Sequence, residues 1–509
     1  MKIKKKFQDS VIGWLEKKYP GVHDIVNLLD NVRERVDTQY IKGLTELEDL
    51  TKADKEEMKD ILKESGITIE RPEEEGNNLY PKLDSEDNVD KPKENGEKSD
   101  VGDEKSTEIF KQDDGKWRPV VLTLGLVYKL QKITDDFWYD VDSVFMQNKE
   151  KITTLVELLA KYWWYLMDVA TSLKGDDEEL YENLAKGLKV AQDDILYSFV
   201  KDAEKAIVAE HVPDIALIVH HETKEVVLTV CGTKVFPAPS VADIMMDLYC
   251  ESVPFLHGRA HKGMAVACDN ILAKVMDTMV ERLAELPDYK LVIVGYSLGA
   301  GVAQLITLKL TDGEEKARMP PNEILCITFG APPVYLSNEP GYINPSIISV
   351  YNHSDGLSSL SLHTVTKLFL QIRAINRLGI SRRRTFKLLR TKLGESVLED
   401  GSKTGVRRFV SSSAEKEKEW ADITTATQAV TETGFYKLGH TAGVTYLVKR
   451  GDTGHVVRML EGGQAAHLSK ELRLRGGMFN DHMPWGYGGL FKECGGNTSG
   501  LTLDMLKYL

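Results

Sequence analysis

Apolar and polar residues alternate most clearly from residue 214 onward, where short apolar runs are separated by polar turns and helical patterns. The runs 215–219 and 226–230 flank a polar turn, which predicts a hairpin. Later apolar runs that predict strands lie at 291–294, 324–329, 347–351, 444–448 and 455–459. Because most of these runs alternate with helical patterns, we expect an α/β fold with a mostly parallel sheet covered on both faces.

The chain before residue 214 divides into three parts. Residues 1–66 place apolar side chains at helical spacing among lysines, which predicts a helical N-terminal segment. Residues 67–113 contain few apolar and many acidic side chains, which predicts a disordered acidic linker. Residues 114–213 regain a helical pattern, and we expect the aromatic run 162–165 to lie in a core. The basic N-terminal helix could pack on its own domain or lie on an anionic membrane surface.

Composition narrows the classes of function. The 509 residues suggest two or three domains, and the hydrophobic content of 42% is enough for a globular core. The net charge of −13 argues against nucleic acid as a general partner, because phosphate binding needs a basic face. Scattered cysteines, the absence of a signal-peptide pattern and the absence of an apolar run of roughly 20 residues predict a cytoplasmic protein.

The most informative motif is Gly-Tyr-Ser-Leu-Gly at 295–299, between the apolar run 291–294 and a helical pattern rich in small residues. This strand–turn–helix context predicts a nucleophile elbow, in which a serine is held in strained backbone geometry above a sheet. Ser297 is therefore the candidate nucleophile. The backbone N–H of Leu298 is a candidate oxyanion donor, and Thr233, at the end of an earlier strand, is a second candidate unless it forms an ordinary turn.

A serine nucleophile needs a histidine to accept its proton and a carboxylate to orient that histidine. Asp355 directly follows the run 347–351, at a strand end where α/β sheets place reactive groups. His482 lies in a late loop and is favoured as the base, although spacing alone does not decide among the later histidines. The other candidates are His363, which we expect on a helix, His440, His455 and His467.

Five segments resemble, in order, the class 3 lipase family, with motifs most similar to those of the sn-1-specific diacylglycerol lipases. They are 226–233, 242–254, 261–264, 295–301 and 328–332, within a similar region of about 214–490. The family's terminal Asp-His-x4-Tyr motif falls on Asp481, His482 and Tyr487. The resemblance implies an α/β-hydrolase core, a triad of Ser297, Asp355 and His482, and an oxyanion hole formed by Thr233 and Leu298.

By this resemblance, the chain should hydrolyse an acylglycerol ester through an acyl-enzyme, without a metal or organic cofactor. A phospholipase A1, another carboxylesterase and a non-catalytic lipase-like scaffold are the alternatives. A lid is expected within residues 234–260. Substrate or lid contacts are expected at Phe236, Ile244, Met245, Met246, His261 and Tyr296.

A basic segment lies between Arg373 and Lys392, where no acidic residue occurs. It opens an expected insertion at 373–430 in the α/β core, and a tail should follow at 491–509. Arg382, Arg383, Arg384 and the basic N-terminus are candidates for contact with a membrane or a lipid droplet. A solvated helix pair or a clamp on the acidic linker would explain the same pattern.

Overall fold

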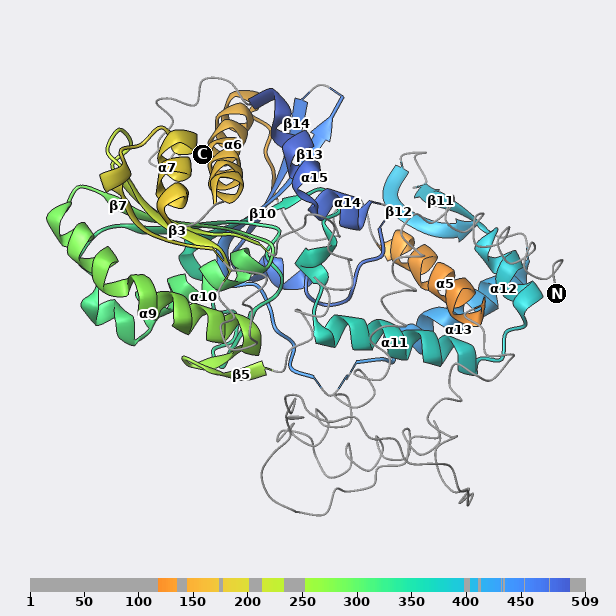
Figure 1. Cartoon of the computed structure of the whole chain (residues 1–509). Helices are drawn as coiled ribbons and strands as arrows, with labels where there is room; N and C mark the ends of the chain where they lie inside the picture. Colours follow the sequence, from red (N-terminus) through yellow and green to blue (C-terminus); the bar gives the residue numbers. More distant parts are fainter. Residues whose placement is uncertain are drawn as a thin grey trace, which may run out of the picture.

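A nine-stranded sheet forms the centre of the molecule (Figure 1). The computed structural model describes residues 118–134, 144–173, 177–200, 213–232, 252–397, 403–410 and 413–494, except 432, 434, 453 and 476. In sheet order, the strands are β1 (Val144–Phe145), β14 (Gly454–Glu461), β13 (Ala442–Gly451), β10 (Asn344–Asn352), β8 (Ile324–Phe329), β7 (Lys290–Tyr296), β4 (Glu225–Val230), β3 (Ile215–His220) and β2 (Ile195–Phe199). The five strands from β13 to β4 run parallel, so the expected α/β fold with a mostly parallel sheet is confirmed.

The strands expected from the apolar runs are present. The predicted hairpin is β3 and β4, which pair antiparallel with Leu217 opposite Leu228. Its turn ends at Lys224, whose φ of 53° is unusual for a residue with a side chain. The runs at 291–294, 324–329 and 347–351 lie in β7, β8 and β10, because continuous β-branched and apolar residues suit strands that are buried on both faces.

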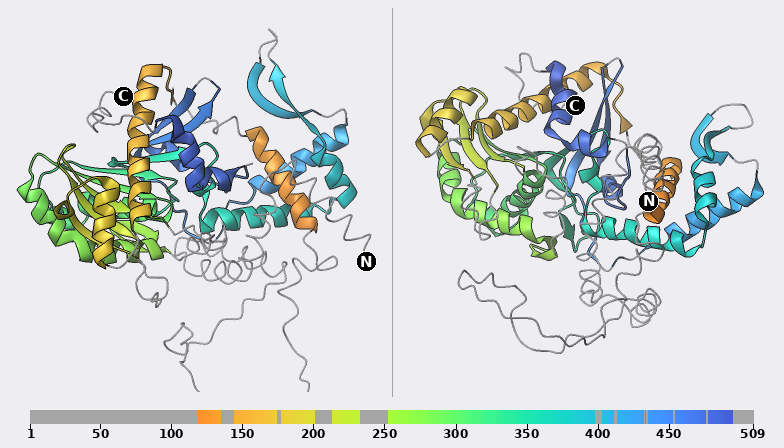
Figure 2. Two further views of the ribbon diagram at one scale, coloured as in Figure 1. Left: turned by 45° about the horizontal axis from the view of Figure 1, so that its top comes forward. Right: turned by 45° about the vertical axis from the view of Figure 1, so that its right-hand side comes forward.

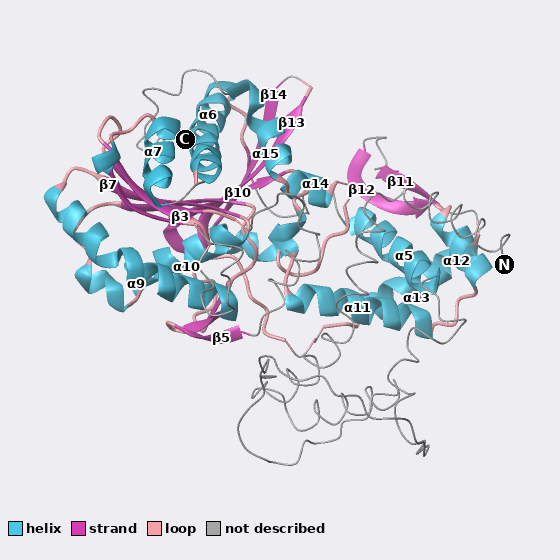
Figure 3. Ribbon diagram, viewed as in Figure 1, coloured by secondary structure: helices cyan, strands magenta, loops and turns pink. Residues whose placement is uncertain are grey.

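Helices cover both faces of the sheet (Figures 1 and 3). One face packs against α9 (Lys262–Glu285) and α10 (Leu298–Asp312), the other against α6 (Lys149–Ser172), α7 (Asp177–Leu188) and α15 (Pro484–Phe491). Side chains alternate between the faces along β4: Leu228 belongs to the cluster that contains α9 and α10, and Val227 to the cluster around α6. Each face of the sheet therefore carries its own apolar layer.

The helix α6 brings the aromatic run into the core. Asn148 caps its N-terminus by accepting hydrogen bonds from the N–H groups of Glu150 and Lys151. Of the aromatic run expected in a core, Tyr162 and Trp163 are almost completely buried, whereas Trp164 and Tyr165 are partly buried at its edge. Trp163 packs on Tyr296 and Phe329 at the carboxyl ends of β7 and β8, next to the functional site described below. Tyr162 instead donates to Glu225 at the start of β4.

A second lobe contains the expected basic insertion. It consists of α11 (Leu362–Arg377), α12 (Arg382–Leu389), the hairpin β11 (Lys392–Val397) with β12 (Lys403–Val410), and α13 (Ala414–Gln428). The helix α5 (Arg118–Thr134), from before the sheet in sequence, packs on α11 and α12 in this lobe (Figure 2). The region 114–213 therefore contributes α5 to this lobe, and α6, α7, β1 and β2 to the sheet and its cover.

Several expectations fall on residues that the structure does not describe. They are the helical segment at 1–66, the linker at 67–113 and most of the tail expected at 491–509. The described start of that tail is structured: the buried Phe491 ends α15, and Lys492–Cys494 form a 3-10 helix. Within the described ranges, no helix is both long and apolar enough to cross a membrane.

Candidate active site

The turn between β7 and α10 places Ser297 at the carboxyl end of the central strands. Ser297 has φ 57° and ψ −126°, a strained backbone conformation for a residue with a side chain. The flanking glycines are required by close approach: a Cβ on Gly295 would lie 2.6 Å from the carbonyl oxygen of Gly299. A Cβ on Gly299 would lie 2.3 Å from the carbonyl oxygen of Val230. The sharp turn therefore depends on the two glycines of the pentapeptide.

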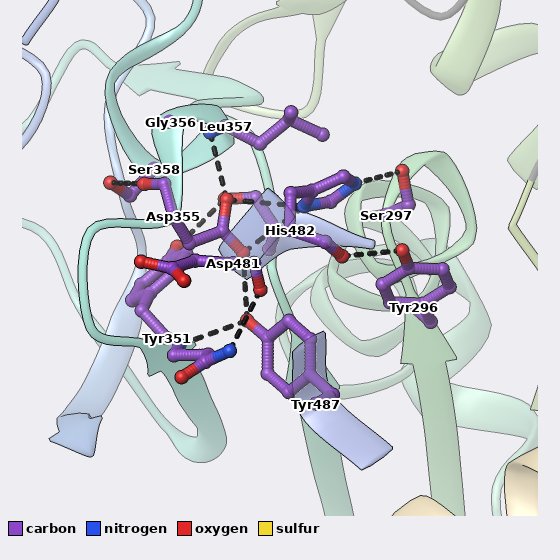
Figure 4. A network of polar contacts seen from close by, with 12 residues as sticks. Tyr296, Ser297, Tyr351, Asp355, Gly356, Leu357, Ser358, Asp481, His482 and Tyr487 are labelled. Carbon is purple, nitrogen blue, oxygen red and sulfur yellow. Dashed lines mark hydrogen bonds and ion pairs between the residues drawn. The ribbon is translucent and has the colours of Figure 1, made fainter. Parts of the chain in front are cut away.

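Three buried side chains meet at this turn (Figure 4). The Oγ of Ser297 lies 2.9 Å from Nε2 of His482, and Nδ1 of His482 lies 3.0 and 3.1 Å from the two carboxylate oxygens of Asp355. The carboxylate fixes the tautomer, because Nδ1 must carry a proton in order to donate a hydrogen bond to Asp355. The lone pair of Nε2 is then left to accept the proton of the Ser297 hydroxyl. This arrangement can activate Ser297 as a nucleophile.

The carboxylate of Asp355 is held by two further donors. The backbone N–H of Leu357 donates to Oδ1 at 2.9 Å, and the Tyr487 hydroxyl donates to Oδ2 at 2.8 Å. Burial, followed by the negative charge of Asp355, raises the pKa of Tyr487 well above its usual value. The phenol therefore remains protonated and able to donate. Together these donors orient the carboxylate toward His482.

Tyr296 packs on the face of the His482 imidazole. Its hydroxyl donates to the carbonyl oxygen of His482 at 2.6 Å, and its ring stacks on the imidazole with centroids 5.2 Å apart. Burial, and then the charge of Asp355, raises the pKa of Tyr296, so its hydroxyl also stays protonated. Tyr296 was expected among the residues that contact substrate; in the structure its side chain is buried and stacks on the imidazole of His482.

His482 ends the short helix α14 (Met478–His482), not the late loop expected from the sequence. Asp481, in the same helix, joins α14 to the loop that carries Asp355. Its Oδ2 accepts the backbone N–H of Ser354 at 3.1 Å and lies 3.1 Å from Nδ1 of His353. Its carbonyl oxygen accepts a hydrogen bond from the Asn352 side chain at 2.9 Å. His353 has φ 46°, so this loop holds an uncommon backbone conformation. Asp481 therefore fixes the position of α14 relative to the loop that carries Asp355.

Trp163 of α6 packs behind the aromatic residues of the site. Its ring stacks on Tyr487 with centroids 4.9 Å apart and contacts Tyr296 and Phe329 edge-on at 5.3 and 5.4 Å. These three aromatic residues come from β7, β8 and α15, so one side chain of α6 supports three elements of the site.

Comparison with known proteins adds to this geometry. Residues 227–364 match the family described as Lipase (class 3). The resemblance to the class 3 lipases is confirmed. The matched range includes Ser297 and Asp355 but ends before His482, which only the fold brings to the other two residues.

Individual relatives either match a short part of the chain or match it at low sequence identity. Diacylglycerol lipase-beta of the mouse, Mus musculus, is 32% identical over 110 residues, which are 20% of this chain and 16% of that protein. The solved triacylglyceride lipase of Rhizomucor miehei is 14% identical at a TM-score of 0.29, covering 42% of this chain and 75% of that chain. The lipase of Rhizopus microsporus var. chinensis is 15% identical at a TM-score of 0.31, covering 44% and 73%.

Of the two residues expected to line an oxyanion hole, Leu298 and Thr233, the structure describes only Leu298. Leu298 is the first residue of α10, where backbone N–H groups have no acceptor within the helix. Thr233 lies outside the described residues. Its neighbour Gly232 lies beside the nucleophile, since a Cβ there would be 3.2 Å from Cβ of Ser297. The residues that follow β4 therefore lie beside the elbow.

The expected lid and substrate contacts are mostly beyond what the structure describes. Phe236, Ile244, Met245 and Met246 lie outside the described residues. The part of the expected lid that is described, residues 252–260, forms a hairpin of β5 (Ser252–Phe255) and β6 (Gly258–His261) that pairs with β9 (Tyr335–Ser337). His261 is buried and caps α9, where its Nδ1 accepts the N–H of Met264 at 3.3 Å.

The other candidate histidines lie away from Ser297 in different surroundings. His363 is on α11, as expected, and its Nδ1 lies 2.8 Å from the hydroxyl of Thr433. His440 is buried and donates from Nε2 to the carbonyl oxygen of Ser358 at 2.7 Å. His455 lies on β14 and His467 ends a short 3-10 helix. Of the five candidate histidines, only His482 forms a hydrogen bond with Ser297 within the described part of the chain.

Sequence reasoning named Asp481 and Tyr487 as motif residues but gave them no role. Their place in the Asp-His-x4-Tyr motif was the available signal, and their hydrogen bonds to the Asp355 loop supply the reason for it. Trp163 was expected only in a core, because no local pattern indicates which aromatic residue packs behind a distant site.

Proposed function

We propose that this chain is a serine lipase that hydrolyses a carboxylic ester of an acylglycerol. The observation that carries the proposal is the buried contact series from Ser297 through His482 to Asp355, at 2.9 and 3.0 Å. The match of residues 227–364 to the class 3 lipases supports ester hydrolysis as the reaction class.

The proposed reaction begins when the Oγ of Ser297 attacks the ester carbonyl while Nε2 of His482 accepts its proton. Asp355 stabilises the imidazolium that forms. The oxyanion would be bound by the N–H of Leu298 at the start of α10, together with a donor from Thr233. His482 then gives its proton to the departing alcohol, which breaks the ester bond and leaves an acyl group on Ser297. A water molecule, deprotonated by His482, releases the fatty acid and restores the serine.

Within this reaction class, we propose a diacylglycerol as the substrate. The support is the similarity over 110 residues to mouse diacylglycerol lipase-beta, which covers only 16% of that protein. A phospholipase A1 or another carboxylesterase would use the same three residues and differ in the pocket around them. A panel of diacylglycerol, triacylglycerol, phosphatidylcholine and a soluble ester separates these substrates. A rate that rises when substrate passes from monomers to micelles would support the expected lid.

A fluorophosphonate probe tests the serine mechanism directly, because it labels only an activated serine. The wild-type protein should be labelled, Ser297→Ala should not, and His482→Ala should lose nearly all labelling. Ser337→Ala, on β9 and away from the triad, is the matched serine control and should label normally. If the folded wild-type protein does not react, even with detergent present, the chain is better explained as a non-catalytic lipase-like scaffold.

A further inference from the structure

The helix α12 has an inward face that fixes its orientation. Leu388 and Leu389 are fully buried, and the buried Lys129 of α5 donates from Nζ to the carbonyl oxygen of Leu389 at 2.9 Å. On another side, Nε of Arg384 lies 2.6 and 2.7 Å from the carboxylate oxygens of Glu419 on α13. These contacts tie α12 to two neighbouring helices, so its remaining face has a defined direction.

That remaining face carries a row of basic side chains, which we call the basic row: Arg383, Lys387 and Arg390. Their spacing of four and then three residues places them on one side of the helix. All three are exposed, and none has an ion-pair partner among the residues that the structure describes. The exposed Lys392 lies two residues after Arg390, at the start of β11. Leu378, in the turn before α12, is an apolar side chain that is 39% exposed.

The basic row does not improve the stability of α12. A cation in the first helical turn, such as Arg383, opposes the helix dipole, and like charges four residues apart repel. The first turn of α12 contains no acidic residue that would offset this charge. In a chain with a net charge of −13, such a surface indicates a binding role rather than a structural one.

We propose that the basic row docks the protein on an anionic phospholipid surface. Three cations on one side of a fixed helix match a plane of negative head groups. The exposed Leu378, in the turn that precedes α12, supplies an apolar side chain for the interfacial region. The structure changes which arginines of the 382–384 run are suited to this contact. Arg384 is turned inward to Glu415 and Glu419, whereas Arg383 faces outward with Lys387 and Arg390.

The proposal is independent of the catalytic chemistry at Ser297. It is tested with the full chain, by sedimentation with vesicles of phosphatidylcholine alone or mixed with phosphatidylserine, at low and high salt. The test variant is Arg383→Gln/Lys387→Gln/Arg390→Gln. The charge-matched control is Lys186→Gln/Lys316→Gln/Lys418→Gln, which removes three exposed positive charges elsewhere. The melting temperatures of both variants verify that they fold.

We expect wild type and control to bind the phosphatidylserine vesicles and to dissociate at high salt. The basic-row variant should bind roughly 100-fold more weakly. Ser297→Ala should bind like wild type, so failure of the proposed hydrolysis would leave this result unchanged. Absence of binding at low salt, or equal binding by test variant and control, would overturn the proposal. Carbodiimide cross-links from Lys387 to carboxylates of residues 84–104 would also overturn it, by identifying that acidic segment as the occupant.

Discussion

The hydroxyl of Tyr487 donates to Oδ2 of Asp355 at 2.8 Å, although the two residues lie 132 positions apart in the chain. The same phenol oxygen accepts the backbone N–H of Asn352 at 3.2 Å. One tyrosine thus fixes both the carboxylate and the strand end that precedes it. Since burial raises the pKa of Tyr487, the phenol stays protonated and can act as this donor.

Replacement of Tyr487 by Phe should lower kcat roughly tenfold, because a hydrogen bond to a charged group contributes about 1.5–3 kcal/mol. KM should change little, since the phenol does not face the serine hydroxyl. Steady-state kinetics on a soluble ester measure both constants. Tyr446→Phe, another buried tyrosine on the sheet, is the control. Equal kcat values for the two variants would argue against a positioning role for Tyr487.

Substitution of Gly330 by Ala should lower activity by displacing Asp355 and His482. Gly330 has φ +62°, and an added Cβ would lie 2.8 Å from Oδ2 of Asp355 and 2.9 Å from Nδ1 of His482. The resulting displacement of the Asp–His pair should lower kcat/KM by roughly 100-fold. Gly341→Ala is the matched control, because Gly341 has φ +74° and nothing within 4 Å of the added Cβ. If both variants keep full activity, the Asp–His distance does not limit the rate.

Asp481 offers a graded test of loop positioning. Asp481→Asn keeps an oxygen that can accept the N–H of Ser354, whereas Asp481→Ala removes it. We expect the rate of fluorophosphonate labelling to fall about threefold for Asn and at least tenfold for Ala, as a hydrogen bond of about 1 kcal/mol or more is lost. Asp422→Ala, at an exposed position on α13, should label normally. Labelling rates that do not follow this order would show that Asp481 has no influence on Ser297.

Lys129 should stabilise the second lobe. Its Nζ donates to the carbonyl oxygens of Leu389 and Thr391 at the end of α12, so Lys129→Met leaves buried acceptors without this donor. We expect the free energy of unfolding to fall by about 2–3 kcal/mol in denaturant titrations. Lys132→Met, on the same helix, should cost less than about 1 kcal/mol because its contact is a cation–π interaction with Tyr128.

Buried histidines should make the fold less stable in acid. Burial lowers the pKa of His440 from 6.5 to about 4, and the pKa values of His220 and His363 fall to about 4 for the same leading reason. Because the unfolded chain takes up these protons first, stability should be complete above pH 6.5 and fall as the pH drops toward 4. His440 alone would contribute at most about 3 kcal/mol to this loss. Urea unfolding of wild type and His440→Gln should give a shallower pH dependence for the variant; equal slopes would contradict the assignment.

The sequence by itself determined the features that depend on residues close together in the chain. The apolar runs at 215–219 and 226–230 gave the hairpin β3–β4, because strand formation follows the local pattern of side chains. The elbow around Ser297 was likewise predictable, since the flanking glycines are a local requirement of the turn. The motif at 481–487 pointed to His482, but spacing did not distinguish it from His440 or His467.

Only the tertiary structure decided which distant groups meet. The contact between His482 and Ser297, the orientation of Arg384 toward Glu419 and the packing of α5 on α12 all join segments far apart in sequence. Such contacts depend on how the strands are ordered in the sheet and how the second lobe packs, because the free energy that selects them comes from many side chains buried together. No local pattern records that sum, so the sequence could name the candidate residues without placing them.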